Sequence, residues 1–310
     1  LIRPSIVKYL IRNFVRGTEG IICPSEIVLD TVNSYGVTIP KRVIPTGIEI
    51  NRFKRPDITD LDVATRREAL GIKPDEMILL SLSRIAAEKN IQAVIRALPE
   101  VLESFPVKLV IVGHGPYESA LKTLVDDLNL NQSVIFTGQV PNEQTAYYYK
   151  MADFFISAST SETQGLTYLE AIAAGTRVLA CDNPYLEGLI DDREFGRLFA
   201  NETEIGKTIC TALSEWTPIQ LDRFNDKLYE ISAENFAKQV YLFYLDVIIE
   251  YKTRKHLEEN RLPAKMEDVV RQMPLHVTRS IKREQIRAKY FARKASKLAK
   301  NWQTYVKIDK

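Results

Sequence analysis

Two glutamates stand eight positions apart in the stretch SETQGLTYLE, where Glu162 precedes and Glu170 follows the triplet Gly165-Leu166-Thr167. The surrounding residues predict a strand before this stretch and a helix within it. The triplet therefore falls at a helix N-terminus, where unpaired backbone N–H groups attract anions. Carboxylates accept hydrogen bonds from the hydroxyls of a sugar or ribose. The stretch fits a ligand with an anionic middle and hydroxyl-rich ends, such as a sugar nucleotide. Two solvated carboxylates are the alternative that these residues alone leave open.

Two cations follow another predicted strand, EMILLSLS. Arg84 comes at the end of that strand, and Lys89 comes five residues later, where a predicted helix over residues 90–104 begins. Two fixed positive charges and the positive end of a helix dipole suit a diphosphate. A solvated arginine and lysine near a helix start are the other interpretation of the same spacing.

Two further strand ends carry glycine. Gly113 and His114 end the segment VKLVIVGH, and Gly138, Gln139 and Val140 end the segment SVIFTGQV. Because glycine lets a backbone approach a ligand closely, both turns are candidate walls of one site. The first turn does not match a dinucleotide-binding fingerprint, since glutamate stands where the third glycine would fall. His114 is equally compatible with a plain turn residue.

Short β-branched runs alternate with amphipathic stretches of helical length between residues 20 and 200. The expected strands lie at 19–25, 41–47, 76–83, 107–113, 133–138, 152–159 and 177–182, and the expected helices lie at 91–104, 118–128, 143–151 and 166–175. This alternation predicts an α/β fold with a doubly wound parallel sheet. Ligands of such sheets bind beyond the carboxyl ends of the strands, where the candidate residues fall.

The net charge of +2 hides a strong asymmetry. Residues 252–310 hold 17 basic and 6 acidic side chains, a net charge of +11, which leaves −9 on the remainder. Cys23, Cys181 and Cys210 are far apart and form no Cys-x-x-Cys pair. This argues against a disulfide framework or a zinc ribbon and suits a reducing cytoplasm. No apolar run reaches the roughly 18 residues that a membrane-spanning helix needs.

The basic tail predicts an amphipathic helix over residues 279–306, because its apolar residues recur mostly at steps of three and four. A helix of this type, with interfacial aromatic residues, lies in the headgroup plane of an anionic membrane. The candidate membrane-binding residues are Lys282, Arg283, Arg287, Lys289, Arg293, Lys294, Lys297 and Trp302. We therefore expect peripheral attachment to the inner, cytoplasmic face of the plasma membrane.

Two alternatives to membrane binding remain for this tail. Its apolar stripe could pack on another part of the protein. The tail could also bind nucleic acid, but the acidic body and the lack of regular aromatic interleaving argue against that class.

The run from residue 152 to residue 180 resembles the donor-binding signature of the retaining glycosyltransferases of family 4, which have the GT-B fold. Glu162 and Glu170 match the two glutamates of that signature, and Arg84 and Lys89 match its arginine and lysine. Upstream, the segments IICPSE and VIPTGIEINRF are similar to the last strands of the acceptor domain of the family. The resemblance covers residues 19–243. Within the family, the sequence Glu-Thr-Gln-Gly-Leu-Thr is most similar to that of bacterial diacylglycerol glucosyltransferases and related glycolipid synthases.

The resemblance implies a role for each candidate residue. Arg84 and Lys89 would hold the nucleotide diphosphate together with the backbone donors of Gly165 to Thr167. Glu170 would hold the ribose, and Glu162 the transferred sugar. The turn of Gly138, Gln139 and Val140 would border the base, and Gly113 and His114 would lie near the donor. Glu162, Arg84 and Lys89 are then the candidate catalytic residues.

The implied reaction moves a hexose, with glucose expected first, from a UDP-sugar to a lipid such as diacylglycerol. It needs no metal and no cofactor besides the donor substrate. A family 4 enzyme acting on a polysaccharide or a glycoprotein precursor is the alternative acceptor class.

The resemblance also predicts how the chain is divided. We expect residues 1–56 to be the C-terminal remnant of a Rossmann-like acceptor domain and 57–76 to be a linker. Residues 77–235 would be the donor domain, 236–254 a crossover helix and 255–310 the basic extension. The glycine-rich loop and usual catalytic histidine of the acceptor domain find no match here. We therefore expect this chain to bind the donor without completing turnover alone.

Two departures affect the expected site. The family usually has aspartate where His114 stands, which leaves the donor preference at that turn open. Asp60 and Asp62 form an Asp-x-Asp pair of the kind that holds a divalent cation in other glycosyltransferases. They fall in the expected linker and not at a strand end, so we expect no metal site there.

Overall fold

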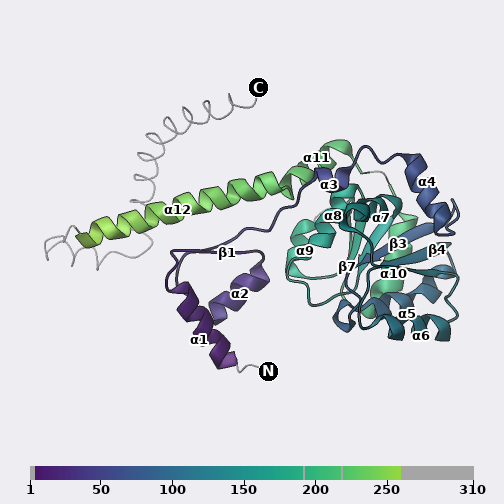
Figure 1. The fold of residues 1–310 in the computed structure, drawn as a ribbon, viewed down its shortest axis with the longest axis horizontal. Helices are drawn as coiled ribbons and strands as arrows, with labels where there is room; N and C mark the ends of the chain where they lie inside the picture. Colours follow the sequence, from purple (N-terminus) through teal and green to yellow (C-terminus); the bar gives the residue numbers. More distant parts are fainter. Residues whose placement is uncertain (1–3, 191–192, 218, 260–310) are drawn as a thin grey trace. The chain divides into compact units, whose positions relative to one another are not determined.

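The computed structural model describes residues 4–190, 193–217 and 219–259 (Figure 1). The chain divides into two units between Val247 and Ile248. The helix α12, Ala233–Glu259, runs through this boundary. The predicted tail helix and its membrane-binding residues lie outside the described residues, so they stay predictions.

A small lobe opens the first unit. Its elements are α1 (Pro4–Val15), β1 (Ile21–Cys23), α2 (Glu26–Ser34) and β2 (Lys41–Val43). The two strands pair in parallel, with Ile21 opposite Lys41. Both strands were predicted, and their parallel pairing fits the expected remnant of a Rossmann-like domain. Neither helix was predicted.

A six-stranded parallel sheet forms the body of the unit. Its strands are β3 (Met77–Leu82), β4 (Val107–Val112), β5 (Val134–Gly138), β6 (Phe154–Ser157), β7 (Arg177–Cys181) and β8 (Gly196–Phe199). They lie in the order β5-β4-β3-β6-β7-β8. This is the doubly wound order, in which the chain reverses direction across the sheet between β3 and β6. The predicted α/β fold is confirmed, and β8 is the strand that was missed.

Helices cover both faces of this sheet. The connecting elements are η1 (Ala87–Lys89), α5 (Ile91–Leu102), α6 (Glu118–Asp127), η2 (Asn142–Gln144), α7 (Thr145–Met151), α8 (Leu166–Ala174), α9 (Pro184–Leu189), η3 (Glu202–Glu204), α10 (Ile205–Ser214) and α11 (Leu221–Glu230). Side chains alternate between faces along a strand. Ile78 and Leu80 accordingly join the core under α7 and α8, while Leu79 joins the core under α5, α6 and α10.

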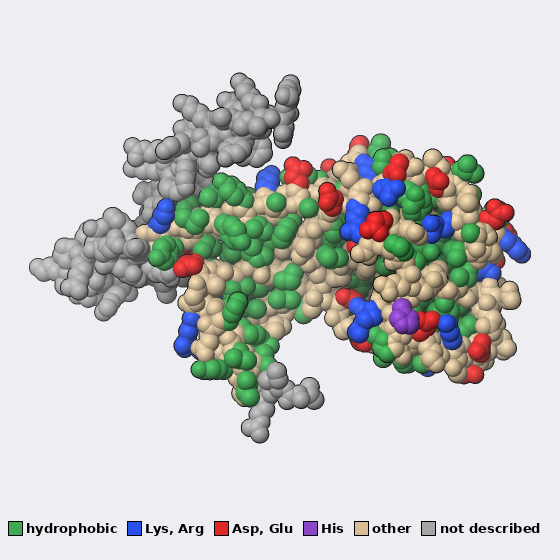
Figure 2. Space-filling model, in the orientation of Figure 1, with side chains coloured by type: hydrophobic (Ala, Val, Ile, Leu, Met, Phe, Trp, Pro, Cys, Tyr) green, Lys and Arg blue, Asp and Glu red, His purple; other side chains and the backbone are tan. Residues whose placement is uncertain are grey.

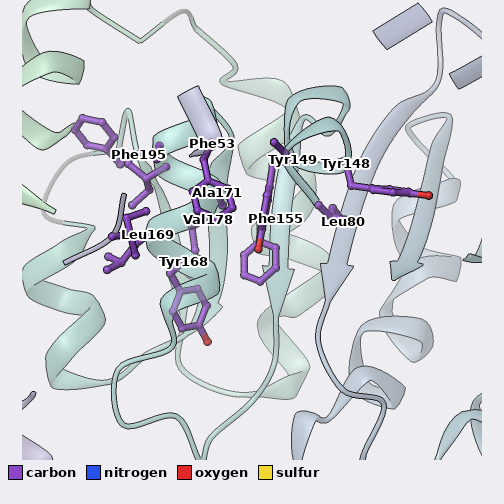
Figure 3. Packing of buried hydrophobic residues seen from close by; sticks show 14 of the residues in the cluster. Phe53, Leu80, Tyr148, Tyr149, Phe155, Tyr168, Leu169, Ala171, Val178 and Phe195 are labelled. Atoms are coloured by element: carbon purple, nitrogen blue, oxygen red, sulfur yellow. The ribbon is translucent and has the colours of Figure 1, made fainter. Parts of the chain in front are cut away.

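Aromatic rings fix the start of α8 (Figure 3). Phe53 of α3 (Asn51–Lys54) packs on Tyr149 of α7, with 6.0 Å between ring centroids. Tyr149 continues to Phe155 of β6 at 5.9 Å, and Phe155 to Tyr168 of α8 at 5.6 Å. The first and third of these contacts are edge-on, a geometry that stabilises beyond the area that the rings bury. The first turn of α8 therefore has a fixed place relative to the end of β6.

The expected linker, residues 57–76, contains the helix α4 (Asp60–Ala69). Thr59 and Asp62 form a capping box at its N-terminus, each side chain bonding the backbone N–H of the other. Arg66 lies 5.0 Å from the ring centroids of Tyr147 and Tyr148 on α7. The segment connects the small lobe to the six-stranded sheet, as expected of a linker, but it forms a helix that packs against α7.

Hydrophobic side chains gather on the surface of the small lobe (Figure 2). On α1 the exposed ones are Ile6, Tyr9, Leu10 and Phe14, and Phe14 is 82% exposed. These four residues recur at steps of three, one and four along the helix, so they share one face of it. None of the helices in the described part of the chain is long and apolar enough to cross a membrane.

Candidate donor-binding site

A cavity of about 460 Å³ lies at the switch point of the sheet. Residues 81–84 at the end of β3 and residues 155–157 at the end of β6 form two of its walls. These strands are neighbours, and their crossover connections leave on opposite faces of the sheet. A crevice opens there for that topological reason, and it is where doubly wound folds bind nucleotides.

The cationic wall comes from Arg84 and from Lys89, the last residue of η1. Arg84 pairs with Glu88 one turn later, and its side chain is 64% exposed. Lys89 is more enclosed, and its ammonium pairs with the carboxylate of Glu162. Both cations predicted from the sequence therefore line one cavity, in reach of an anion between them.

The opposite wall is the start of α8. Gly165, Leu166 and Thr167 line the cavity, and no side chain of the described residues caps this helix. The first N–H groups of an uncapped helix need partners from outside the helix, and an anion supplies them. Glu162 stands just before this helix and also lines the cavity. These groups therefore line one cavity, and their binding of a donor stays a prediction.

Glu170 does not line the cavity. It lies five residues after Gly165, and its carboxylate accepts a hydrogen bond of 2.8 Å from the Tyr149 hydroxyl. Burial raises the pKa of Glu170, while this bond and the charge of Arg52 oppose the rise. Its expected contact with a ribose remains a prediction.

The glycine turns also stay outside the lining of the cavity. A Cβ on Gly113 would lie 1.9 Å from the carbonyl oxygen of Ser83, and its φ is +139°. The close approach that this glycine allows is therefore to the chain itself, where Ser83 follows β3. His114 is 73% exposed and pairs with Glu118 at 2.9 Å. The glycine at position 113 and the contact of His114 are thus both explained by interactions within the chain. Their roles toward the donor remain predictions.

The second turn adjoins the first, because Gly113 donates a backbone hydrogen bond of 2.9 Å to Gly138. Gln139 is exposed and Val140 partly buried. These three residues lie at the same edge of the sheet as the cavity, but none of them lines it. Their place beside the base stays a prediction.

Several polar residues of the cavity were not predicted. Ser81, Ser83, Ser157 and Ser161 line it together with Glu88. A signal for three of them was present, because Ser81 and Ser83 stand in the run LSLS and Ser157 stands in the run FISAS, both of which lead to the carboxyl edge. Hydroxyls there add donors toward an anion.

Asp62 of the Asp-x-Asp pair has a structural role. The carboxylate of Asp62 accepts hydrogen bonds from the backbone N–H of Thr59, at 2.8 Å, and from the Thr59 hydroxyl. Within the described residues, no three histidine, cysteine or acidic side chains gather as a metal site would require.

The match to a family model agrees with this arrangement. A model described as "Glycosyl transferases group 1" matches residues 62–230, more than half of the chain. The chain belongs to the group 1 glycosyltransferases. The resemblance to family 4 enzymes predicted from SETQGLTYLE and from the Arg84–Lys89 spacing is thereby confirmed.

Curated relatives of this glycosyltransferase include two enzymes with the same name. The alpha-monoglucosyldiacylglycerol synthase of Streptococcus pneumoniae is 53% identical over 261 residues, which are 84% of this chain and 59% of that protein. The synthase of that name from Acholeplasma laidlawii is 33% identical over 212 residues, 66% of this chain and 52% of that protein. The chain thus spans a little over half the length of these relatives.

Solved structures confirm the GT-B fold of this glycosyltransferase. Anabaena HepE, in complex with UDP and glucose, superposes with a TM-score of 0.68 at 20% identity, over 78% of this chain and 67% of that one. The sucrose-phosphate synthase of Thermosynechococcus elongatus superposes with a TM-score of 0.67 at 22% identity, over 79% of this chain and 62% of that one. At such identities the likeness concerns the fold alone.

Proposed function

We propose that this chain carries the donor half of a retaining glycosyltransferase that moves glucose from UDP-glucose to diacylglycerol. The observation that carries the proposal is the cavity at the switch point, where Arg84, Lys89, the start of α8 and Glu162 meet. Cations and helix N–H groups suit a diphosphate, and a carboxylate suits sugar hydroxyls. UDP-glucose has both kinds of group.

The residues can stabilise the leaving group without a metal. As the bond between the sugar and the diphosphate breaks, negative charge grows on the diphosphate oxygen. Arg84, Lys89 and the N–H groups of Gly165 to Thr167 are preorganised donors toward that charge. Losing one such donor typically costs roughly 10²–10³ in rate.

The ion pair of Lys89 and Glu162 favours a ligand that carries both a diphosphate and a hexose. A diphosphate competes for the ammonium of Lys89, and the hydroxyls of the hexose compete for the carboxylate of Glu162. Each half of the pair is replaced by its own part of the donor. A ligand with only one of these parts leaves one charge without its former partner, which costs free energy.

The acceptor and the anomeric outcome are proposed from the relatives. The name of the Streptococcus pneumoniae enzyme describes an alpha-linked glucosyl product on diacylglycerol. Because the glucose of UDP-glucose is also alpha-linked, such a product means retention of configuration. The rival acceptor is a polysaccharide or glycoprotein precursor. We further propose that the protein works at the inner face of the plasma membrane, held there by the basic tail.

A product assay tests the proposal. The full-length protein is supplied with UDP-glucose or UDP-galactose and with vesicles containing diacylglycerol, and the lipids are separated and analysed. We expect alpha-glucosyl diacylglycerol from UDP-glucose and at least a hundredfold less from the Lys89→Ala variant. Transfer only to a water-soluble acceptor, or preference for UDP-galactose, would contradict the acceptor or the sugar respectively.

A further inference from the structure

The loop between β6 and α8 contains a buried glutamine that the donor site does not use. Gln164 is only 7% exposed, although it lies between the exposed Thr163 and the start of α8. Burying a side-chain amide is costly unless its polar atoms find partners. Its partners therefore indicate what the loop is attached to.

The amide of Gln164 reaches a segment far away in the sequence. Its Nε2 donates a hydrogen bond of 2.8 Å to the carbonyl oxygen of Thr46, 118 positions earlier. Tyr185 of α9 lies beside the same amide. Burial raises the pKa of Tyr185 to about 12, and the hydrogen bond with Gln164 opposes that rise. Gln164 thus joins the donor loop to two other elements.

Thr46 lies where two segments of the chain, residues 46–48 and 231–233, cross in backbone contact. Two residues later, Ile48 is hydrogen-bonded through its backbone to the segment around Ser232. The N–H of Ile48 donates to the carbonyl oxygen of Ile231 at 2.9 Å, and its carbonyl oxygen accepts from the N–H of Ala233 at 2.8 Å. A Cβ on Gly47 would lie 2.2 Å from the carbonyl oxygen of Ser232. The two passages are therefore in contact at the backbone, and Thr46 offers a fixed point.

Other hydrogen bonds hold the loop less firmly. Ser159 donates to the carbonyl oxygen of Glu88 at 3.4 Å, a length at which hydrogen bonds are weak. Glu162 is held by its ion pair with Lys89, which a donor would replace. The bond from the buried Gln164 to Thr46, at 2.8 Å, is shorter than the hydrogen bonds of Ser159 and needs no charged partner that a donor would replace.

We propose that Gln164 is a positioning residue that fixes Glu162 for the hexose by tying its loop to the crossing at Thr46. This inference rests on the proposed function of the site. Gln164 is two residues from Glu162, so it sets where that carboxylate stands. The N–H groups of α8 depend on it less, because Tyr168 and Leu169 anchor that helix in the core at 1% and 2% exposure.

The anchoring predicts a split between two ligands. Loss of the anchor should weaken contacts to the hexose and spare contacts to the diphosphate. UDP-glucose affinity should therefore fall by about fivefold or more, the effect of losing about one hydrogen bond, while UDP affinity changes by less than about twofold. A general loss of structure would lower both affinities together.

Calorimetry on this chain with UDP and with UDP-glucose tests the inference. Gln164→Met keeps the length of the side chain and removes the donor, and Gln164→Glu puts an acceptor opposite the Thr46 carbonyl. Arg177→Met is the matched control. Arg177 is also 7% exposed and donates to a backbone carbonyl, that of Glu194, at 3.0 Å. It begins β7 and so lies at the opposite edge of the sheet from the cavity.

A double variant decides whether Gln164 acts through Glu162. In a chain that already carries Gln164→Met, adding Glu162→Gln should lower UDP-glucose affinity by no more than about twofold, because the two residues serve one contact. Equal losses for UDP and UDP-glucose, an unchanged UDP-glucose affinity, or fully additive losses would overturn the inference. Absence of UDP binding by the unaltered chain would instead overturn the proposed function itself.

Discussion

The ammonium of Lys89 and the carboxylate of Glu162, 73 positions apart in the chain, form an ion pair in the wall of the cavity. Both side chains are largely enclosed, at 24% and 21% exposure. The pair joins the cation expected to hold the diphosphate to the carboxylate expected to hold the sugar. A donor that binds there has to exchange both partners.

Removing the carboxylate should therefore affect two ligands in opposite ways. In Glu162→Gln, Lys89 has no ion pair to give up, so UDP affinity should stay the same or rise by a few fold. The additional affinity that UDP-glucose gains from its hexose should disappear. Calorimetry with both ligands measures this. Glu215→Gln, which removes the partner of Arg197 outside the cavity, should change neither affinity. A loss of UDP affinity in Glu162→Gln would assign this glutamate to the nucleotide instead.

Glu170 should make stability depend on pH. Burial raises its pKa in the folded protein. A carboxyl with a raised pKa favours folding most when protonated, so its contribution falls as pH rises from the unfolded pKa through the folded one. Glu170→Gln keeps an acceptor for Tyr149 and removes the charge. We expect a higher melting temperature than wild type at pH 7.

The gain from Glu170→Gln should shrink as the pH is lowered toward the unfolded pKa of a glutamate, about 4.3. The exposed Glu143→Gln serves as the control and should show no such trend. A variant that melts below wild type at pH 7, or a gain that does not depend on pH, would contradict the cause assigned to the pKa.

Two glycines at the carboxyl edge should differ in what a methyl group costs. Gly113 and Gly138 both have positive φ, +139° and +72°. Only at Gly113 would a Cβ meet backbone, the carbonyl oxygen of Ser83. Gly138→Ala should lower the free energy of unfolding by about 1–2 kcal/mol from its backbone conformation alone. Gly113→Ala should cost at least about 2 kcal/mol more, as measured by urea unfolding. Equal losses would show that the contact relaxes freely.

The basic tail should bind anionic vesicles. Each lysine or arginine near an anionic leaflet contributes about 1 kcal/mol, so four engaged cations would raise partitioning roughly a thousandfold. Sedimentation with vesicles of increasing phosphatidylglycerol content measures this for the chain with and without residues 279–310. Neutral phosphatidylcholine vesicles are the control. Binding that ignores anionic lipid, or that survives the deletion undiminished, would mean that the tail is not the anchor.

The sequence predicted the elements whose burial leaves a strong pattern. The runs around Leu79, Val110 and Phe155 are apolar on both faces, as strands of a buried parallel sheet are. By contrast β8 has only four residues, and two of them are glycine and arginine. Half of the side chains of the helix α4 are charged, although the Thr59–Asp62 capping box was a usable signal.

The site was predictable where chemistry and strand ends coincide. Arg84, Lys89 and Glu162 were predicted to meet, because topology brings the carboxyl ends of parallel strands to one edge. The bond between Gln164 and Thr46 could not be predicted. A single glutamine has no periodic pattern, and its partner is a backbone atom whose place depends on the packing of two chain passages.

We propose above all that the cavity beside Arg84 binds the diphosphate of a uridine nucleotide. Calorimetric titration of this chain with UDP tests it most directly, for wild type, Arg84→Ala and the control Arg96→Ala, which removes an exposed arginine of α5. A hydrogen bond to a charged group contributes about 1.5–3 kcal/mol, so we expect Arg84→Ala to bind UDP roughly tenfold or more weakly. Arg96→Ala should bind UDP as wild type does. UDP affinity that is the same in Arg84→Ala and wild type would mean that Arg84 does not hold the diphosphate.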